Sequence, residues 1–325
     1  MEQLKSPLND NVKQFRNDEN QIRTVIWAKG IDAPRLGNVI KGGDFRRSQA
    51  GQFVDYYTPF VPGKGWYDVD KRSGNDADVN LCFAATAANM LHWWYDQNQQ
   101  KIDHFLTKRD QNQPLDPTDV NTFKDARYFK NSFQSQQDSG FFKYFGHHFG
   151  NNVGGFHTDL LIDLFLNGHK PHPGGANNSN WQNMDNFTID PRGGLFHPVF
   201  GRKILTDRTH SRNTHQAFGD QIKEIFQKGN LPSIAYNINS SLAHIVTAWG
   251  AEYDLDGKIT AVYITDSDDG GDPLNGMRRY GIKNFNGRPL YGNNVVDPSR
   301  GSALQYIHVL TPGTADWDTY IQQNP

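Results

Sequence analysis

The sequence predicts an α+β fold in which helices come early in the chain and an antiparallel sheet comes late. From Cys82 to about residue 100, the chain carries Ala, Met, Leu and Trp without Gly or Pro, as a buried helix does. After Pro232, strand-like runs follow one another: SIAYNI, HIVTAWGAEYD, KITAVYITDSD and, near the end, QYIHVL. Asp256-Gly257 is a hairpin signal between two of these runs. Helices first and hairpin-linked strands later are typical of an α+β domain.

Two further helices and one early strand complete the predicted elements. A helix over 159–167 ends before Gly168, and a helix over 214–228 ends before Gly229, since glycine is favoured after a helix end. The run TVIW at 24–27 predicts the first strand.

The remaining segments predict loops and one catalytic domain. Residues 1–23 are charged and rich in Asn and Gln, which predicts a flexible N-terminal arm before a single domain over 24–325. Residues 35–80 are dense in Gly with islands of aromatic residues, which predicts irregular structure leading to a site. Residues 171–200 are rich in Gly, Asn and Pro and predict a long loop.

Composition excludes several classes of function. The 325 residues include 33 Lys plus Arg and 35 Asp plus Glu, for a net charge of -2, so we expect neither a nucleic-acid nor a membrane partner. Cys82 is the single cysteine, which excludes an intramolecular disulfide and a multi-cysteine metal site. The polar N-terminus lacks the apolar core of a signal peptide. A cytoplasmic protein and a mature secreted domain both fit it.

Cys82 is the first candidate for chemistry. It stands where a Gly-rich loop gives way to the predicted helix. Unpaired N–H groups and the positive end of the helix dipole stabilise a thiolate there and can receive a developing oxyanion. A lone cysteine is otherwise most often a small buried apolar residue. Cys82 by itself is therefore compatible with two roles, a catalytic nucleophile and a buried core residue.

A histidine and two aspartates can serve such a nucleophile as base and orienting groups. Of 12 histidines, His244 opens the strand HIVTAWG, so its side chain can project from the end of a rigid element. Asp266 ends the next strand, and Asp268 follows on the same face. His244 and Asp266 lie about equally far from the turn, which predicts that they meet. A satisfied strand-end histidine and a solvated turn are the alternatives.

A papain-type enzyme needs one more donor for the oxyanion, usually a Gln upstream of the cysteine. Residues 65–81 contain no Gln, and Lys71 is the nearest polar donor before Cys82. The chain order Cys, His, Asp, with the helix before the sheet, is the papain-type order.

The run Asp78 to Asn98, DVNLCFAATAANMLHWWYDQN, closely resembles the nucleophile segment of the IgG-degrading streptococcal cysteine endopeptidases, the IdeS or Mac family. Other segments resemble that family in the same order: TVIWAKG at 24–30, GWYDVDK at 65–71, DLLIDLFLNG at 159–168, DPRGGLFHPVF at 190–200, HIVTAWGAEYD at 244–254 and ITAVYITDSD at 259–268. The resemblance spans nearly the whole chain after residue 24.

The resemblance implies a papain-like fold, with the nucleophile helix packed on the C-terminal antiparallel sheet. It implies Cys82 as nucleophile, His244 as base, Asp266 as third member, Asp268 as a supporting carboxylate and Lys71 as oxyanion donor. The implied protein is a secreted, monomeric virulence factor that needs no cofactor and no metal. Its implied substrate is the lower hinge of an immunoglobulin heavy chain, usually IgG, recognised through the folded antibody.

Three departures and three alternatives accompany this resemblance. Phe83 stands where the family more often has Gly, one extra residue lies between Lys71 and Cys82, and the insert at 172–186 has no counterpart. These departures bear on specificity. The alternatives are the same chemistry on IgM or another immunoglobulin, a Cys-His-Asp acyltransferase or deamidase, and an immunoglobulin-binding module without catalysis.

Overall fold

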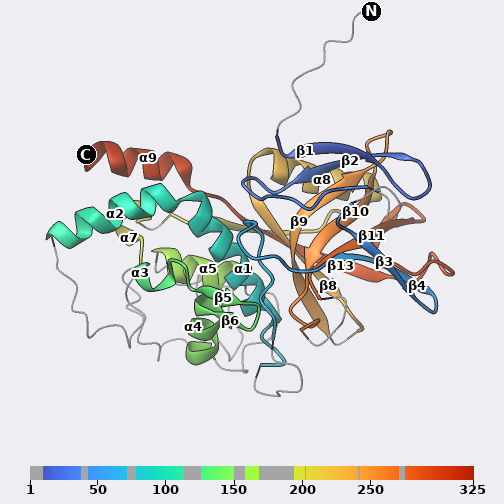
Figure 1. Ribbon diagram of the computed structural model, residues 1–325, viewed down its shortest axis with the longest axis horizontal. Helices are drawn as coiled ribbons and strands as arrows, with labels where there is room; N and C mark the ends of the chain where they lie inside the picture. Colours follow the sequence, from blue (N-terminus) through green and yellow to red (C-terminus); the bar gives the residue numbers. More distant parts are fainter. Residues whose placement is uncertain are drawn as a thin grey trace, which may run out of the picture. The chain divides into compact units, whose positions relative to one another are not determined.

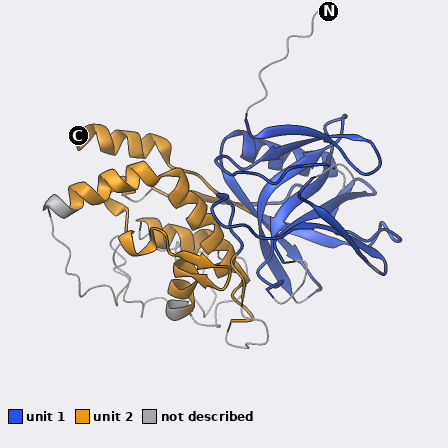
Figure 2. Cartoon of the chain, viewed as in Figure 1, with its two compact units in different colours: residues 1–68, 209–307 blue, residues 69–208, 308–325 orange. Residues whose placement is uncertain are grey.

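The computed structural model describes residues 10–37, 43–71, 78–112, 126–149, 158–167, 194–201, 203–240, 242–270 and 275–325. The chain forms two compact units (Figure 2): unit 1 comprises Met1–Asp68 and Thr209–Ile307, and unit 2 comprises Val69–Arg208 and His308–Pro325. The insert at 172–186 and most of the loop expected at 171–200 lie outside the described residues. Within the described chain, none of the helices is both long and apolar enough to cross a bilayer. The expected single domain over 24–325 and the packing of the Cys82 helix on the sheet stay predictions.

A large antiparallel sheet forms most of unit 1 (Figure 1). Its strands are β1 (Val12–Arg16), β2 (Ile22–Trp27), β3 (Arg46–Ala50), β4 (Phe53–Thr58), β7 (Thr206–His210), β8 (Leu231–Asn237), β9 (Ala243–Tyr253), β10 (Ile259–Thr265), β11 (Met277–Phe285), β12 (Arg288–Tyr291) and β13 (Ser302–Leu310). The six strands from β8 to β13 pair in a closed ring, β9 carries the β2–β1 hairpin, and β11 carries the β4–β3 hairpin. The predicted late antiparallel sheet and the α+β class are confirmed.

Strand β9 is the centre of this sheet because it pairs with three neighbours. Its first half pairs with β8 and its second half with β2 along one edge, while β10 occupies the other edge. After Ala243 every residue of β9 is buried, as expected for a strand covered on both faces. The β9–β10 connection closes with Asp254 N–H donating to the Lys258 carbonyl and Gly257 at φ 76°. The predicted hairpin is confirmed, with a longer loop than two residues.

Helix α8 (His215–Gln227) lies in unit 1 and confirms the predicted helix over 214–228. Thr214 caps it, since its side chain accepts from the Ala217 N–H at 3.2 Å. The apolar face carries Phe218, Ile222 and Phe226, all essentially buried, and the helix packs on β2, β8 and β10.

Two early segments differ from the sequence predictions. Val12–Arg16 forms β1 and pairs with β2 in register, so the arm predicted over 1–23 is wrong for this stretch. Three of its five side chains are polar, as is common for a strand at the sheet edge, so composition does not distinguish it from the arm. Within 35–80, β3 and β4 form a hairpin turning at Gly51, φ 59°, so irregular structure is wrong there. Tyr56 and Tyr57 belong to strand β4.

A buried ionic cluster connects four strands of unit 1: β2, β9, β10 and β11. The Glu252 carboxylate is fully buried, and Arg279 donates to both of its oxygens at 2.7 Å. Thr260 and Tyr263 hydroxyls donate to it at 2.7 and 2.9 Å, and Arg23 Nε lies 3.4 Å away. Burial alone raises the pKa of Glu252, but these partners hold it below its ordinary value. The cluster therefore depends on an ionised carboxylate.

Unit 2 is mainly helical. Its helices are α1 (Cys82–Gln97), α2 (Gln99–Asn112), α3 (Ala126–Phe129), α4 (Gly140–Phe149), α5 (Thr158–Asn167), α7 (His197–Phe200) and α9 (Thr314–Gln323), with a small hairpin of β5 (Phe133–Ser135) and β6 (Asp138–Ser139). The predicted helices beginning at Cys82 and ending at Asn167 are confirmed. Every residue of α1 from Cys82 to Tyr95 is buried, and α2, α4 and α5 pack around it. Trp94 packs on Phe196 and Trp317, so aromatic residues fill this core.

Candidate active site

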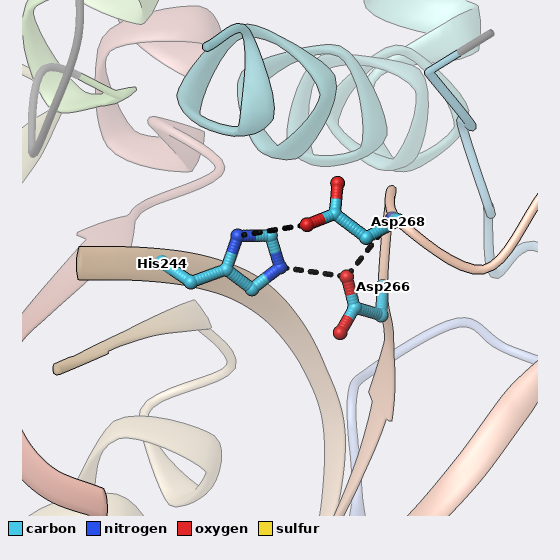
Figure 3. Close-up of side chains that lie close together, drawn as sticks. All are labelled: His244, Asp266 and Asp268. Carbon is cyan, nitrogen blue, oxygen red and sulfur yellow. Dashed lines mark hydrogen bonds and ion pairs between the residues drawn. The ribbon is translucent and has the colours of Figure 1, made fainter. Parts of the chain in front are cut away.

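His244 and two aspartates come together at one end of the β9–β10 hairpin in unit 1, as their spacing predicts. Figure 3 shows the imidazole between the two carboxylates. His244 Nε2 lies 2.6 Å from Asp266 Oδ1, and Nδ1 lies 3.7 Å from Asp268 Oδ2. The histidine is 4% exposed, with Tyr236 of β8 packed edge-on against its ring. The short contact to Asp266 and the burial fix the orientation of the ring.

Protonation of this pair follows from the state of Asp266. Burial raises the pKa of Asp266, but the neighbouring His244, the Asp268 N–H and Arg278 outweigh it and lower the pKa to about 2. The ionised carboxylate can only accept, so Nε2 of His244 carries the proton that it donates. In the neutral imidazole, the basic nitrogen is therefore Nδ1.

A β-bulge at Trp249 decides which way the aspartates face. Tyr263 pairs with Gly250, but Ile264 pairs with Ala248, so one extra residue of β9 lies between these pairs. Beyond the bulge, Thr265 pairs with Thr247, which places the next residue, Asp266, on the face of β9 that carries His244. Without the bulge, the register would shift by one and Asp266 would face the opposite side.

The turn that carries the aspartates is anchored on both sides. Before it, the Thr265 hydroxyl accepts from Trp249 Nε1 and donates to the Tyr67 carbonyl, both at 2.9 Å. Within it, the Asp268 N–H donates to Asp266 Oδ1 at 3.0 Å. After it, Arg278 Nε lies 3.2 Å from the buried Asp269. These contacts hold Asp266 in place before any substrate arrives.

Cys82 is the first residue of α1, in unit 2. Leu81 is the N-cap, and no side chain caps this helix end. The Asp78 carbonyl instead accepts from the Leu81 N–H in a turn that ends at the helix. The first N–H groups of a helix have no carbonyl partner within it, and the Cys82 N–H is one of them. This terminus therefore keeps donors that an anion can use.

Lys71 and Phe83 also belong to unit 2. Lys71 is 9% exposed, and its ammonium donates to the Val79 carbonyl at 2.7 Å, three residues before Cys82. A buried cation thus lies at the loop that leads into α1. Phe83 is fully buried, and its carbonyl accepts from Thr158 of α5 at 3.0 Å. Its side chain belongs to the core of this unit.

The His244, Asp266 and Asp268 cluster could be considered as a metal centre, because each residue offers a ligand atom within 4.8 Å of the others. The Nε2 atom is already bonded to Asp266, so a metal would have Nδ1 and Asp268 as protein ligands. Catalytic zinc sites use three protein ligands. The geometry suits an oriented base better than a metal.

The described residues include the residue types of a Cys-His-Asp catalytic set: a lone cysteine at a helix start, a histidine–carboxylate pair at a strand end and a buried lysine. The model of the Mac 1 family matches residues 1–317, and the chain belongs to this family. The family resemblance inferred from the sequence is thereby confirmed.

One curated protein is similar to this chain over most of its length. The IgM protease of Streptococcus suis (strain P1/7) is 37% identical over 313 residues, which cover 95% of this chain and 26% of that protein. The chain thus spans about a quarter of the length of this relative.

Acid should weaken unit 1 through Asp266. Its folded pKa of about 2 lies below the ordinary value, so the ionised carboxylate stabilises the fold above about pH 4, by roughly 2 kcal/mol, and this contribution is lost as pH falls toward 2. We expect the difference in unfolding free energy between wild type and Asp266→Asn to shrink over that range, measured by urea unfolding at pH 7, 4 and 3. A difference that is constant with pH would contradict the assignment.

Proposed function

We propose that this chain is a cysteine endopeptidase that cleaves an immunoglobulin heavy chain outside the cell. Family membership supports the class, and the Asp266–His244 hydrogen bond carries the mechanism, because it leaves Nδ1 as the basic atom. The relative named an IgM protease favours IgM as substrate, whereas the resemblance to IgG-degrading enzymes favours the IgG hinge. We place IgM first and IgG second.

In the proposed mechanism, Nδ1 of His244 takes the proton of the Cys82 thiol, and the resulting thiolate attacks the carbonyl carbon of the scissile peptide bond. His244 gives its Nδ1 proton to the leaving amine, while Asp266 holds the imidazole and stabilises its charged form. The Cys82 N–H and Lys71 stabilise the oxyanion of the tetrahedral intermediate. Water, activated by His244, then hydrolyses the acyl-enzyme. Papain-like function requires that the Cys82 sulfur and Nδ1 of His244 meet in the folded enzyme.

The experiment that tests this function is a digestion panel. IgM, IgG, IgA and a denatured peptide are incubated with wild type and Cys82→Ala, and the products are identified by gel and intact mass. We expect one Cys82-dependent cut in a folded heavy chain, in IgM before IgG. If no immunoglobulin is cut while iodoacetamide still labels Cys82, the endopeptidase proposal fails. Ammonia release from glutamine substrates would then identify the acyltransferase or deamidase alternative.

The two aspartates should contribute very unequally to cleavage. Asp266→Asn should lower kcat about 10³- to 10⁴-fold, because an amide does not hold the imidazole tautomer that keeps Nδ1 basic. Asp268→Asn is the matched control, since its carboxylate lies 3.7 Å from Nδ1, beyond hydrogen-bond distance, and we expect roughly a tenfold loss. Steady-state cleavage kinetics measure both. Equal losses for the two variants would contradict the assigned roles.

A further inference from the structure

Unit 1 contains a cavity of about 340 Å³ whose lining shares no residue with the candidate active site. It is bordered by strands β1, β2, β3, β4, β10 and β11, by the turn between β1 and β2, and by the loop over 292–295. Its volume is at the lower end of the range for small-molecule sites, roughly 300 to 1,000 Å³. It is large enough for a ligand of a single ring.

Aromatic side chains form the walls. Tyr56 places its ring beside two guanidinium groups, 5.8 Å from Arg279 and 6.0 Å from Arg47. Phe45 packs edge-on against Tyr263, and both line the cavity. Flat walls of this kind favour an apolar, planar ligand body.

Positive charge predominates in the interior. The floor is the Glu252 cluster, in which Arg23 and Arg279 share a single carboxylate, so one cationic charge is in excess. Lys283 adds a second cation. Its ammonium donates to the Asn294 carbonyl, and the ion pairs among the described residues do not include it, although the charge of Asp297 acts on it from a greater distance.

Two carboxylates also line the cavity, Asp18 and Glu19 on the β1–β2 turn. Both residues are exposed, and the Tyr56 hydroxyl donates to Asp18 at 3.2 Å. Water screens exposed charges more strongly than half-buried ones, so the cations of the interior determine which ligand is favoured. Burial also lowers the pKa of Lys283, and the negative charge of Asp297 opposes this shift.

We propose that this cavity binds a small organic anion, with its anionic group at Lys283 and Arg279 and its planar body against Tyr56. An anion would supply the acceptor oxygens that the Lys283 ammonium can still use, since an ammonium has three donors. The ligand is either a free small molecule or an acidic group of a bound protein substrate. The binding site itself does not depend on the proposed peptidase function.

Fluorine NMR of the full chain with para-trifluoromethylbenzoate tests the proposal, with para-trifluoromethylbenzylamine as the cationic match. We expect the benzoate signal to broaden and saturate while the amine signal does not. Lys283→Met should weaken benzoate binding at least tenfold, and Arg47→Met severalfold. Lys258→Met removes an exposed lysine from the β9–β10 turn and should leave binding unchanged.

Equal binding of the amine and the benzoate would overturn the proposal, as would benzoate affinity that survives both Lys283→Met and Arg47→Met. Circular dichroism of each variant establishes that it is folded, and Arg47 is exposed, so its loss does not disturb the core. Saturating benzoate in the immunoglobulin digestion distinguishes the two sources. Slower cleavage indicates an acidic group of the substrate, and unchanged cleavage indicates a free anion.

Discussion

Replacing Cys82 by alanine is expected to lower kcat/KM for immunoglobulin cleavage by about 10⁵- to 10⁶-fold, the loss seen when a catalytic nucleophile is removed. The thiolate forms the covalent intermediate, and neither Lys71 nor His244 can replace it. Immunoglobulin binding should remain, because alanine removes one sulfur atom from the start of α1. Cleavage is measured by intact mass under single-turnover conditions, and binding by surface plasmon resonance.

Because Cys82 is the single cysteine, thiol chemistry reports on this residue alone. Iodoacetamide should inactivate the wild type in proportion to the modified fraction. Cys82→Ser offers a weaker nucleophile of similar size and should also be nearly inactive. A Cys82→Ala protein that still cuts at the same bond at a tenth of the wild-type rate or faster would exclude the proposed mechanism.

Glu252→Ala should destabilise unit 1 by about 3 to 5 kcal/mol, which is the largest effect that we expect from replacing a buried polar side chain. The substitution leaves Arg279 half-buried without its bidentate partner and removes the acceptor of Thr260 and Tyr263. Urea unfolding followed by tryptophan fluorescence measures the loss.

Glu224→Ala is the matched control for Glu252. Glu224 also pairs with a basic side chain, Lys228 at 2.8 Å, but it lies exposed on α8, where such a pair contributes at most about 1 kcal/mol. Combining Glu252→Ala with Arg279→Met should recover part of the stability, because only one of the two arginines that share the carboxylate, Arg23, then lacks its partner. If Glu252→Ala costs no more than Glu224→Ala, the ionic cluster does not support the fold.

Periodicity and turn signals predicted the parts of this fold that bury apolar residues. The α8 pattern and its following glycine, the helix beginning at Cys82 and the β9–β10 hairpin all appear where expected. The similar spacing of His244 and Asp266 from the hairpin turn also predicted that these two residues meet. Local sequence is informative there because burial selects the residue types directly.

The features that the sequence could not predict depend on partners that are distant along the chain. Edge strand β1 has three polar residues among its five, and its pairing with β2 is what identifies it as a strand. Glu252 of β9 and Arg279 of β11 meet although β10 lies between their strands, and neither carries a local signal of pairing. The cavity cations Arg23 and Lys283 come from strands more than 250 residues apart, so no motif could indicate them.

Because of the extra residue at Trp249, the number of residues between Trp249 and His244 determines which face of β9 carries the imidazole. Inserting or deleting one residue there would turn the imidazole away from Asp266 while keeping every side chain type, whereas a change of two residues would restore the facing. The length of this stretch, and not only its residue types, thus determines the geometry of the site. Designs that graft the β9–β10 hairpin onto another scaffold must carry the bulge along with the histidine and the aspartate.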